Sequence, residues 1–127
     1  MCKPPTFAQF PKQRRLLQTR QYQRVFSEGM RSAEGGLVVL ARCNALGFPR
    51  LGLAVPRKHL RRAVQRNRLK RLIRESFRLH QLELGQLDLI VIARRGVDTM
   101  AAEDVAVALQ RHWAKVKRQS ALTAACR

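Results

Sequence analysis

Acidic residues are scarce in this chain, and their scarcity limits the chemistry that the protein can perform. The 127 residues include only eight Asp and Glu against 26 Lys and Arg, which gives a net charge of +18. Hydrolysis of a phosphodiester with bound metal ions usually needs several carboxylates gathered around those ions. The eight acids are scattered along the chain, and no His–carboxylate pair suggests acid–base catalysis. We therefore predict no catalytic residue and no metal ligand, and consider a protein-only nuclease improbable.

Cysteines and long apolar runs are equally scarce. The three cysteines, Cys2, Cys43 and Cys126, lie far apart without Cys-x-x-Cys spacing, so neither a disulfide framework nor a zinc site is indicated. No apolar run approaches the ~20 residues of a membrane-spanning helix, and residues 1–6 show no secretory signal. We expect a cytoplasmic protein with no membrane partner and no small-molecule substrate. The isolated histidines, expected at surface or boundary positions, are His59, His80 and His112.

Positive charge, by contrast, is abundant and concentrated in one segment. Ten of the 26 cations lie between Arg57 and Arg78. On a helical wheel, the apolar and basic side chains of residues 66–79 separate onto opposite faces. The face that is typical of packing on a sheet comprises Leu69, Leu72, Ile73, Ser76, Phe77 and Leu79. The basic face, with Asn67 near its centre, comprises Arg66, Arg68, Lys70, Arg71, Arg74 and Arg78.

This basic face favours nucleic-acid binding over a merely solvated surface. Five of its six cations are Arg, whose planar guanidinium suits bidentate contact with phosphate. Only Glu75 offers a negative partner on the helix, so the cations repel one another until a polyanion lies across them. Asn67 adds a donor and an acceptor that could contact a base edge or a sugar. DNA is a weaker candidate than RNA, because nothing resembles a helix-turn-helix or zinc module.

The residues before the basic helix predict an arm, a short helix and two strands. Residues 1–15 are typical of an extended basic arm, and a helix follows with Thr19 as its N-cap and Gly29 at its end. The apolar side of this helix carries Tyr22, Val25 and Phe26. Two apolar runs, 37–42 and 50–55, predict an antiparallel hairpin.

The remaining residues predict the basic helix itself, a central strand and a last helix. The basic helix should run from about Gln65 to Glu83, and the almost wholly apolar run 87–93 is typical of a strand covered on both faces. A final helix is expected from about 101 to 119. Its core stripe comprises Ala102, Val105, Ala106, Leu109, Trp113 and Val116.

In this order the elements predict a two-layer α/β sandwich with a small sheet. The basic helix joins two strands, so its apolar face should lie on the sheet and its basic face should point outward. We expect a single RNA-binding domain over residues 1–127, with the arm at 1–15 and a tail at 120–127.

Three segments of the chain resemble the bacterial ribonuclease P protein subunit, over roughly residues 10–117. The first segment is Leu16–Phe26 and the last is Asp88–Gly96. The middle one consists of Gly52–Lys58, Arg61–Ala63 and Arg66–Arg78, with Arg66-Asn-Arg68 as its core. The resemblance implies the order α-β-β-β-α-β-α: about four strands in a small mixed sheet and three helices. It also implies a left-handed crossover through the basic helix, against the usual right-handed rule. The additional strand would come from a split within residues 36–55.

The resemblance further implies a function. Such proteins bind a catalytic RNA and the 5′ leader of precursor tRNA, and assist the endonucleolytic removal of that leader. The protein would thus be the accessory subunit of an RNA-catalysed endoribonuclease: the ribonucleoprotein needs magnesium, and the protein side chains bind no cofactor. The alternative is a ribosome-associated or general RNA-binding module with no role in cleavage, because its charge and fold would look the same.

The resemblance also implies which residues of this chain have these roles, because they occupy the matching positions of the family's motifs. The expected RNA-binding residues are Arg57, Lys58, Arg61, Arg62, Arg66, Asn67, Arg68, Lys70, Arg71 and Arg74. The expected leader cleft contains Tyr22, Phe26 and Arg94. Both aromatics could equally belong to a core, since two aromatic residues four apart on an amphipathic helix commonly do.

Overall fold

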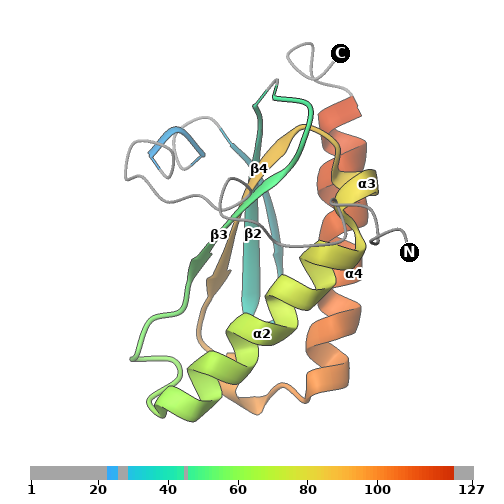
Figure 1. The fold of residues 1–127 in the computed structure, drawn as a ribbon. Helices are drawn as coiled ribbons and strands as arrows, with labels where there is room; N and C mark the ends of the chain where they lie inside the picture. Colours follow the sequence, from blue (N-terminus) through green and yellow to red (C-terminus); the bar gives the residue numbers. More distant parts are fainter. Residues whose placement is uncertain (1–22, 26–28, 45, 122–127) are drawn as a thin grey trace, which may run out of the picture.

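The computed structural model describes residues 23–25, 29–44 and 46–121 (Figure 1). Residues 23–25 are helical, and the elements that follow make one four-stranded sheet and two long helices. The strands are β1 (Met30–Glu34), β2 (Leu37–Cys43), β3 (Arg50–Ala54) and β4 (Leu87–Ala93). The helices are α2 (Ala63–Leu79), α3 (Gln81–Leu84), the 3-10 helix η3 (Val97–Thr99) and α4 (Ala102–Ala121). Among the described elements, no helix is long and apolar enough to cross a membrane.

The sheet has the order β1-β2-β4-β3, so β4 lies between β2 and β3. Strand β2 pairs antiparallel with β1 and with β4, whereas β3 pairs parallel with β4. The predicted hairpin between residues 37–42 and 50–55 is therefore wrong. The apolar run of β4 explains the difference, because a strand buried on both faces is accommodated in the centre of a sheet.

The third early strand, which the family resemblance implied, is β1. It lies before the Gly35–Gly36 turn and not within residues 36–55, where we expected it. Gly35 has φ +60°, a conformation that favours glycine in a tight hairpin turn. A Cβ on Gly36 would stand 2.5 Å from the backbone of Val97, so glycine also permits close packing there.

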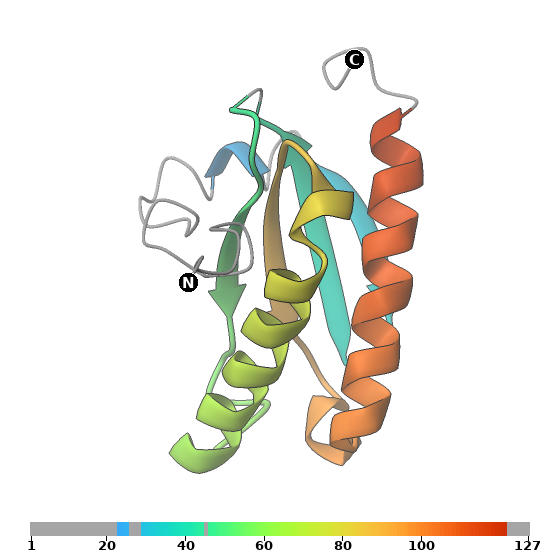
Figure 2. The same cartoon turned by 45° about the vertical axis from the view of Figure 1, so that its right-hand side comes forward.

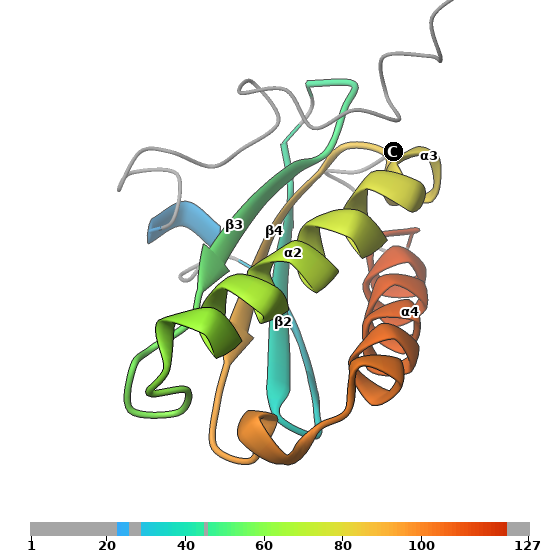
Figure 3. The same ribbon diagram turned by 60° about the horizontal axis from the view of Figure 1, so that its bottom comes forward.

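The connection from β3 through α2 and α3 to β4 is left-handed, as the resemblance implied. Figures 1 and 3 show α2 in front of the sheet, with β3 and β4 both running downward behind it and β4 to the right of β3. A right-handed crossover would place β4 on the left. The apolar face of α2 lies on the sheet in this arrangement, and its opposite face points outward.

Helix α2 packs through the apolar stripe that its sequence predicts. Leu69, Ile73 and Phe77 are buried, and the Phe77 ring meets Trp113 of α4 edge-on with 6.5 Å between ring centroids. The helix ends earlier than expected, at Leu79, which is 65% exposed rather than part of the packed face. The backbone N–H of His80 there donates to Ser76 and Phe77 carbonyl oxygens, and α3 follows as a separate short helix.

Helix α4 lies beside α2 on the same face of the sheet (Figure 2). Val105, Leu109, Trp113 and Val116 are buried as predicted. Ala106 is exposed, which contradicts the predicted stripe. The buried face is shifted because α4 contacts both α2 and the edge strand β1, and its remaining buried residues are Ala108 and His112.

Two expectations about polar residues were also wrong. His112 is fully buried, with its Nδ1 2.7 Å from the hydroxyl oxygen of Ser32 on β1. Cys43, at the end of β2, is disulfide-bonded, although the spacing of the cysteines indicated no disulfide framework.

On the other face of the sheet, Val25 is fully buried against Val38, Leu40 and Ile90.

Candidate nucleic-acid interface

The outward side of α2 presents one row of polar and basic side chains. The row comprises Asn67, Arg71, Arg74 and Arg78, which line a shallow groove together with Glu75. Their spacing of three or four residues places them on one helical face, opposite the buried Leu69 and Ile73. Asn67, Arg71 and Arg74 are exposed, so the amphipathic pattern in the sequence predicted the position of this basic row correctly.

Little negative charge balances the basic row. Arg78 donates to both carboxylate oxygens of Glu75, and this hydrogen bonding lowers the pKa of the Glu75 carboxyl. Among the residues that the structure describes, Arg71 and Arg74 have no hydrogen-bond or ion-pair partner. Their mutual repulsion is therefore unrelieved within this part of the chain, and a polyanion lying along the row would relieve it.

Arg66 differs from the other predicted RNA-binding residues of α2. Its guanidinium is half-buried and donates to the carbonyl oxygens of Leu60 and Arg61, at 2.9 and 2.8 Å. These bonds hold the connection between β3 and α2 in place. No pattern in the sequence predicts this role, because a helical wheel shows only the angle at which Arg66 projects and not the loop that folds against it.

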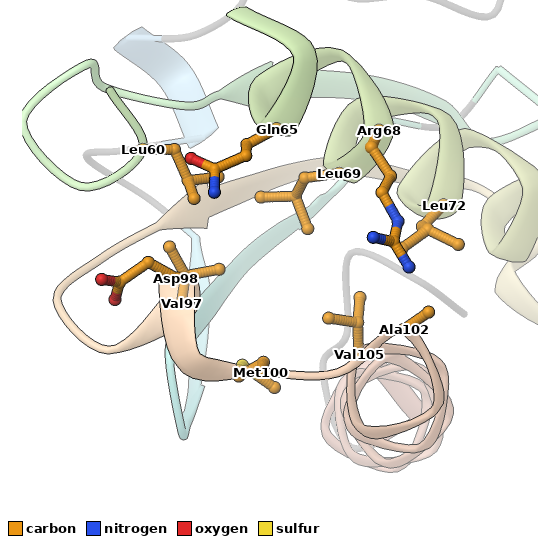
Figure 4. A pocket seen from close by; sticks show the side chains of 10 residues that line it. All are labelled: Leu60, Gln65, Arg68, Leu69, Leu72, Val97, Asp98, Met100, Ala102 and Val105. Atoms are coloured by element: carbon orange, nitrogen blue, oxygen red, sulfur yellow. The ribbon is translucent and has the colours of Figure 1, made fainter. Parts of the chain in front are cut away.

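The flanks of α2 carry the other two predicted cations. Lys70 is half-buried, while Arg68 is exposed beside Leu72 and near the start of α4 (Figure 4). The basic face of the sequence thus divides into a central outward row and two flanking positions.

A second group of cations gathers at one end of the sheet. Because β3 and β4 are parallel, the segments that follow them leave the sheet at the same end. Arg57 and Lys58 follow β3 and are exposed, in a turn closed by the N–H groups of His59 and Leu60 on the Pro56 carbonyl. Arg61 and Arg62 lie just before α2 and are also exposed. The first turn of α2 contains no acidic residue that could pair with them.

Arg94 follows β4 and joins the same end of the molecule. Its backbone N–H donates to the Gly36 carbonyl and its Nε to the Gly35 carbonyl, each at 2.9 Å. Arg94 is thus held against the β1–β2 turn. The other predicted residues of the leader cleft, Tyr22 and Phe26, lie outside the described residues.

A buried ion pair that we did not predict from the sequence lies near the opposite end of the sheet. Arg50 donates to both oxygens of Asp88, at 2.7 and 2.6 Å, and Asn44 donates to Asp88 Oδ1 at 2.8 Å. Asp88 is the one acid within an otherwise apolar strand, and a buried carboxylate needs a paired cation and hydrogen bonds. That isolated acid was the signal that could have found the pair. In the described ranges, no cluster of three His, Cys, Asp or Glu side chains could hold a metal ion.

Comparison with known proteins gives a consistent result. The model of the Ribonuclease P family matches residues 10–117. The ribonuclease P protein component of Methylococcus capsulatus is 46% identical over 110 residues, covering 87% of this chain and 86% of the relative. That of Chromohalobacter salexigens is 48% identical over 110 residues, covering 86% of each.

Solved structures show the same architecture. The RNase P protein of Staphylococcus aureus is 33% identical with a TM-score of 0.74, covering 81% of this chain and 96% of that one. The Thermotoga maritima RNase P protein, solved in complex with 1-(4-fluorophenyl)-2-thiourea, is 33% identical with a TM-score of 0.68. The match covers 78% of this chain and 94% of the Thermotoga maritima chain. The four-stranded mixed sheet, its left-handed crossover and these matches along nearly the whole chain agree, and the chain belongs to the ribonuclease P protein family.

Proposed function

We propose that this chain is the protein component of ribonuclease P and binds the RNA subunit through the basic row of α2. The observation that carries the proposal is the outward row, in which Arg71 and Arg74 have no partner among the described residues, in a chain of this family. A ribosome-associated or general RNA-binding module is not favoured, because the matched relatives are named as ribonuclease P protein components.

The geometry of α2 suits this role. From Asn67 to Arg78 the row spans roughly 16 Å at the 1.5 Å rise of a helix, enough for several phosphates of an RNA backbone. The helix is held from behind by Ile73, Phe77 and Trp113, so the guanidinium groups are presented on a rigid support. Each Arg that neutralises a phosphate also releases counterions, which makes the binding dependent on salt.

We also propose a division of labour between protein and RNA, which the positive charge of the protein supports. The protein supplies a positive field that offsets repulsion between the RNA subunit and its substrate, while the RNA subunit carries the chemistry. The magnesium ions belong to the ribonucleoprotein and not to protein side chains. We expect the purified protein alone not to cleave precursor tRNA, and to stimulate cleavage by the RNA subunit most strongly at low magnesium.

A cleavage assay at several magnesium concentrations, with and without each component, tests this function. The control is the RNA subunit alone at high magnesium, which establishes that the RNA is folded. Cleavage by protein freed of RNA would contradict the assignment of chemistry to the RNA. Tight RNA binding without stimulation would instead support a general RNA-binding module.

We further propose that Tyr22, Phe26 and Arg94 contact the 5′ leader of precursor tRNA. Support comes from Arg94 at the basic end of the sheet, and from Val25, which lies between the two aromatics in sequence and packs on the second face of the sheet. Stacking of a base on an aromatic ring contributes about 1–3 kcal/mol and tolerates any sequence, as a variable leader requires.

Phe26→Ala should therefore weaken binding of precursor tRNA and leave binding of mature tRNA almost unchanged. The measurement compares the two affinities in the reconstituted complex, with a melting curve of the variant alongside. Equal losses for both RNAs, or simple unfolding, would place Phe26 in the core, where truncation costs about 3–5 kcal/mol.

A further inference from the structure

A small cavity lies between α2, η3 and the first turn of α4 (Figure 4). Its volume is about 100 Å³. Its buried apolar walls are Leu60, Leu69, Val97 and Val105, and its half-buried ones are Leu72, Met100 and Ala102. The polar groups at its margin are Gln65, Arg68 and Asp98.

The three polar side chains at the margin are all exposed. None of them has a hydrogen-bond or ion-pair partner among the residues that the structure describes. Figure 4 shows Arg68 at one end of the cavity, with its guanidinium beside Leu72, and Asp98 at the other, with its carboxylate turned away. Apolar walls with a few polar groups at the margin are the usual lining of a ligand site, although this cavity is smaller than most such sites.

The size of the cavity limits what it can hold. An apolar cavity of about 150 Å³ admits benzene. The cavity here is smaller, about 100 Å³, and opens to solvent, so it can take one six-membered planar ring only in part, with the rest of the ring outside, and it excludes a fused pair of rings. The methionine sulfur of Met100 provides a favourable contact for such a ring.

The charge around the cavity points to a nucleotide as the occupant. At about 100° per residue, Arg68 lies on the flank of α2 between the outward basic row and the side that carries Leu69 and Leu72, so an RNA lying along the row can reach the mouth of the cavity. A phosphate is attracted to the Arg68 end and repelled from the Asp98 end, which fixes the direction in which a nucleotide would enter.

We propose that this cavity holds one unpaired pyrimidine of the RNA subunit, with its ring between Leu69 and Met100 and its phosphate on Arg68. The proposal rests on the RNA-binding function proposed above. The pyrimidine must be unpaired and unstacked, because only a base turned out of a helix can present both faces to apolar side chains.

Photo-crosslinking tests the contact directly. The RNA subunit is transcribed with 5-iodouridine or 5-iodocytidine, assembled with the full-length protein and irradiated, and crosslinked peptides are mapped by mass spectrometry. We expect a crosslink within residues 97–105, centred on Met100. Tight binding with crosslinks only elsewhere would overturn the proposal.

A filling variant tests the cavity independently. Ala102→Phe places a ring in the cavity without changing charge, and Ala106→Phe places the same ring on the exposed side of α4, one turn later. Since base stacking contributes about 1–3 kcal/mol, Ala102→Phe should weaken RNA binding roughly fivefold to a hundredfold, and Ala106→Phe should not. Equal affinities for the two variants would count against the proposal.

The two failures can be told apart. If the wild-type protein does not bind the RNA subunit at all, the proposed function is wrong. If it binds and stimulates cleavage, but the Met100 crosslink is missing and Ala102→Phe behaves like Ala106→Phe, only the cavity proposal is wrong. Should Ala102→Phe fail to fold in a melting experiment, the crosslink of the wild-type complex decides alone.

Discussion

The two long helices lie side by side on one face of the sheet and use their outer surfaces differently (Figure 2). Helix α2 carries six cations and one acid, and no acid lies in its first turn. Helix α4 carries four cations and two acids, with Glu103 and Asp104 in its first turn, where negative charge stabilises the helix end. Both helices are amphipathic, so amphipathicity alone does not tell that α2 carries the larger excess of cations.

The pairing of the cations makes the difference clearer. On α4, Arg111 donates to Glu34 of β1 at 2.6 Å, an exposed ion pair that links the helix to the edge strand. On α2, Arg71 and Arg74 have no such partner within the described residues. Exposed pairs such as Arg111–Glu34 contribute little stability, about 0–1 kcal/mol. The contrast matters more for binding than for folding, because a cation without an ion-pair partner, such as Arg71 within the described residues, can exchange its counterion for phosphate without first breaking an ion pair.

The largest effect is expected from the residue that joins the two helices. Trp113 is buried on α4, meets Phe77 edge-on and donates from Nε1 to Ser76 Oγ of α2 at 2.8 Å. Trp113→Ala should lower the free energy of unfolding by about 3–5 kcal/mol, because it leaves a cavity and removes the hydrogen bond. Denaturant unfolding provides the measurement, with the exposed Lys117→Ala as control. A loss below about 1 kcal/mol would mean that α2 does not depend on α4 for its position.

The next effect concerns the unpaired row. Arg71→Ala and Arg74→Ala should each weaken binding to the RNA subunit by about 1–3 kcal/mol and reduce the salt slope by about one phosphate contact. Stability should hardly change, because both side chains are exposed. Arg118→Ala removes the same charge from α4 and is the matched control. If RNA binding has the same salt slope in wild type, Arg71→Ala and Arg118→Ala, the basic row does not contact phosphate and is only a solvated surface.

Elements with a local sequence pattern could be predicted from the sequence, and elements that depend on distant partners could not. Helix α2 and strand β4 were found because their patterns are local: a 3.6-residue period in one and an unbroken apolar run in the other. Strand β1 was not found, since Met30–Glu34 contains no alternation and owes its structure to pairing with β2. The pairing of β3 with β4 is likewise non-local, and no turn residue between β2 and β3 reveals that β4 will separate them.

Within the candidate interface, the sequence predicted which side chains of α2 point outward better than it predicted what each side chain contacts. Arg71 and Arg74 lie where the wheel places them, whereas Arg66 turns back to the carbonyls of Leu60 and Arg61. For His112, we expected an exposed side chain and the structure shows a buried one. It stands seven residues after Val105 and three after Leu109, so spacing placed it on the buried face of α4, although its residue type suggested the surface.

The smallest effect is expected from His112, the buried polar residue of α4. Burial lowers the pKa of this imidazole; Glu34 opposes the shift, while Lys115 and Arg94 add to it. An unfolded chain binds the proton with a pKa of about 6.5, so below that pH the unfolded state takes up more protons than the folded one. Folding stability should therefore be fully present above about pH 6.5 and fall as the pH drops toward the lower folded pKa.

His112→Leu removes this dependence and tests it. The measurement is the free energy of unfolding from pH 7.5 down to pH 5 for both proteins, because acids elsewhere contribute equally to the two curves and cancel in the difference. We expect the difference between wild type and variant to shift in favour of the variant as the pH falls. His59→Leu, at a partly exposed position between β3 and α2, serves as the matched control. A constant difference across this range would mean that His112 accepts a proton as readily in the folded chain as in water, and that α4 is less tightly closed over β1 than Ser32 and His112 indicate.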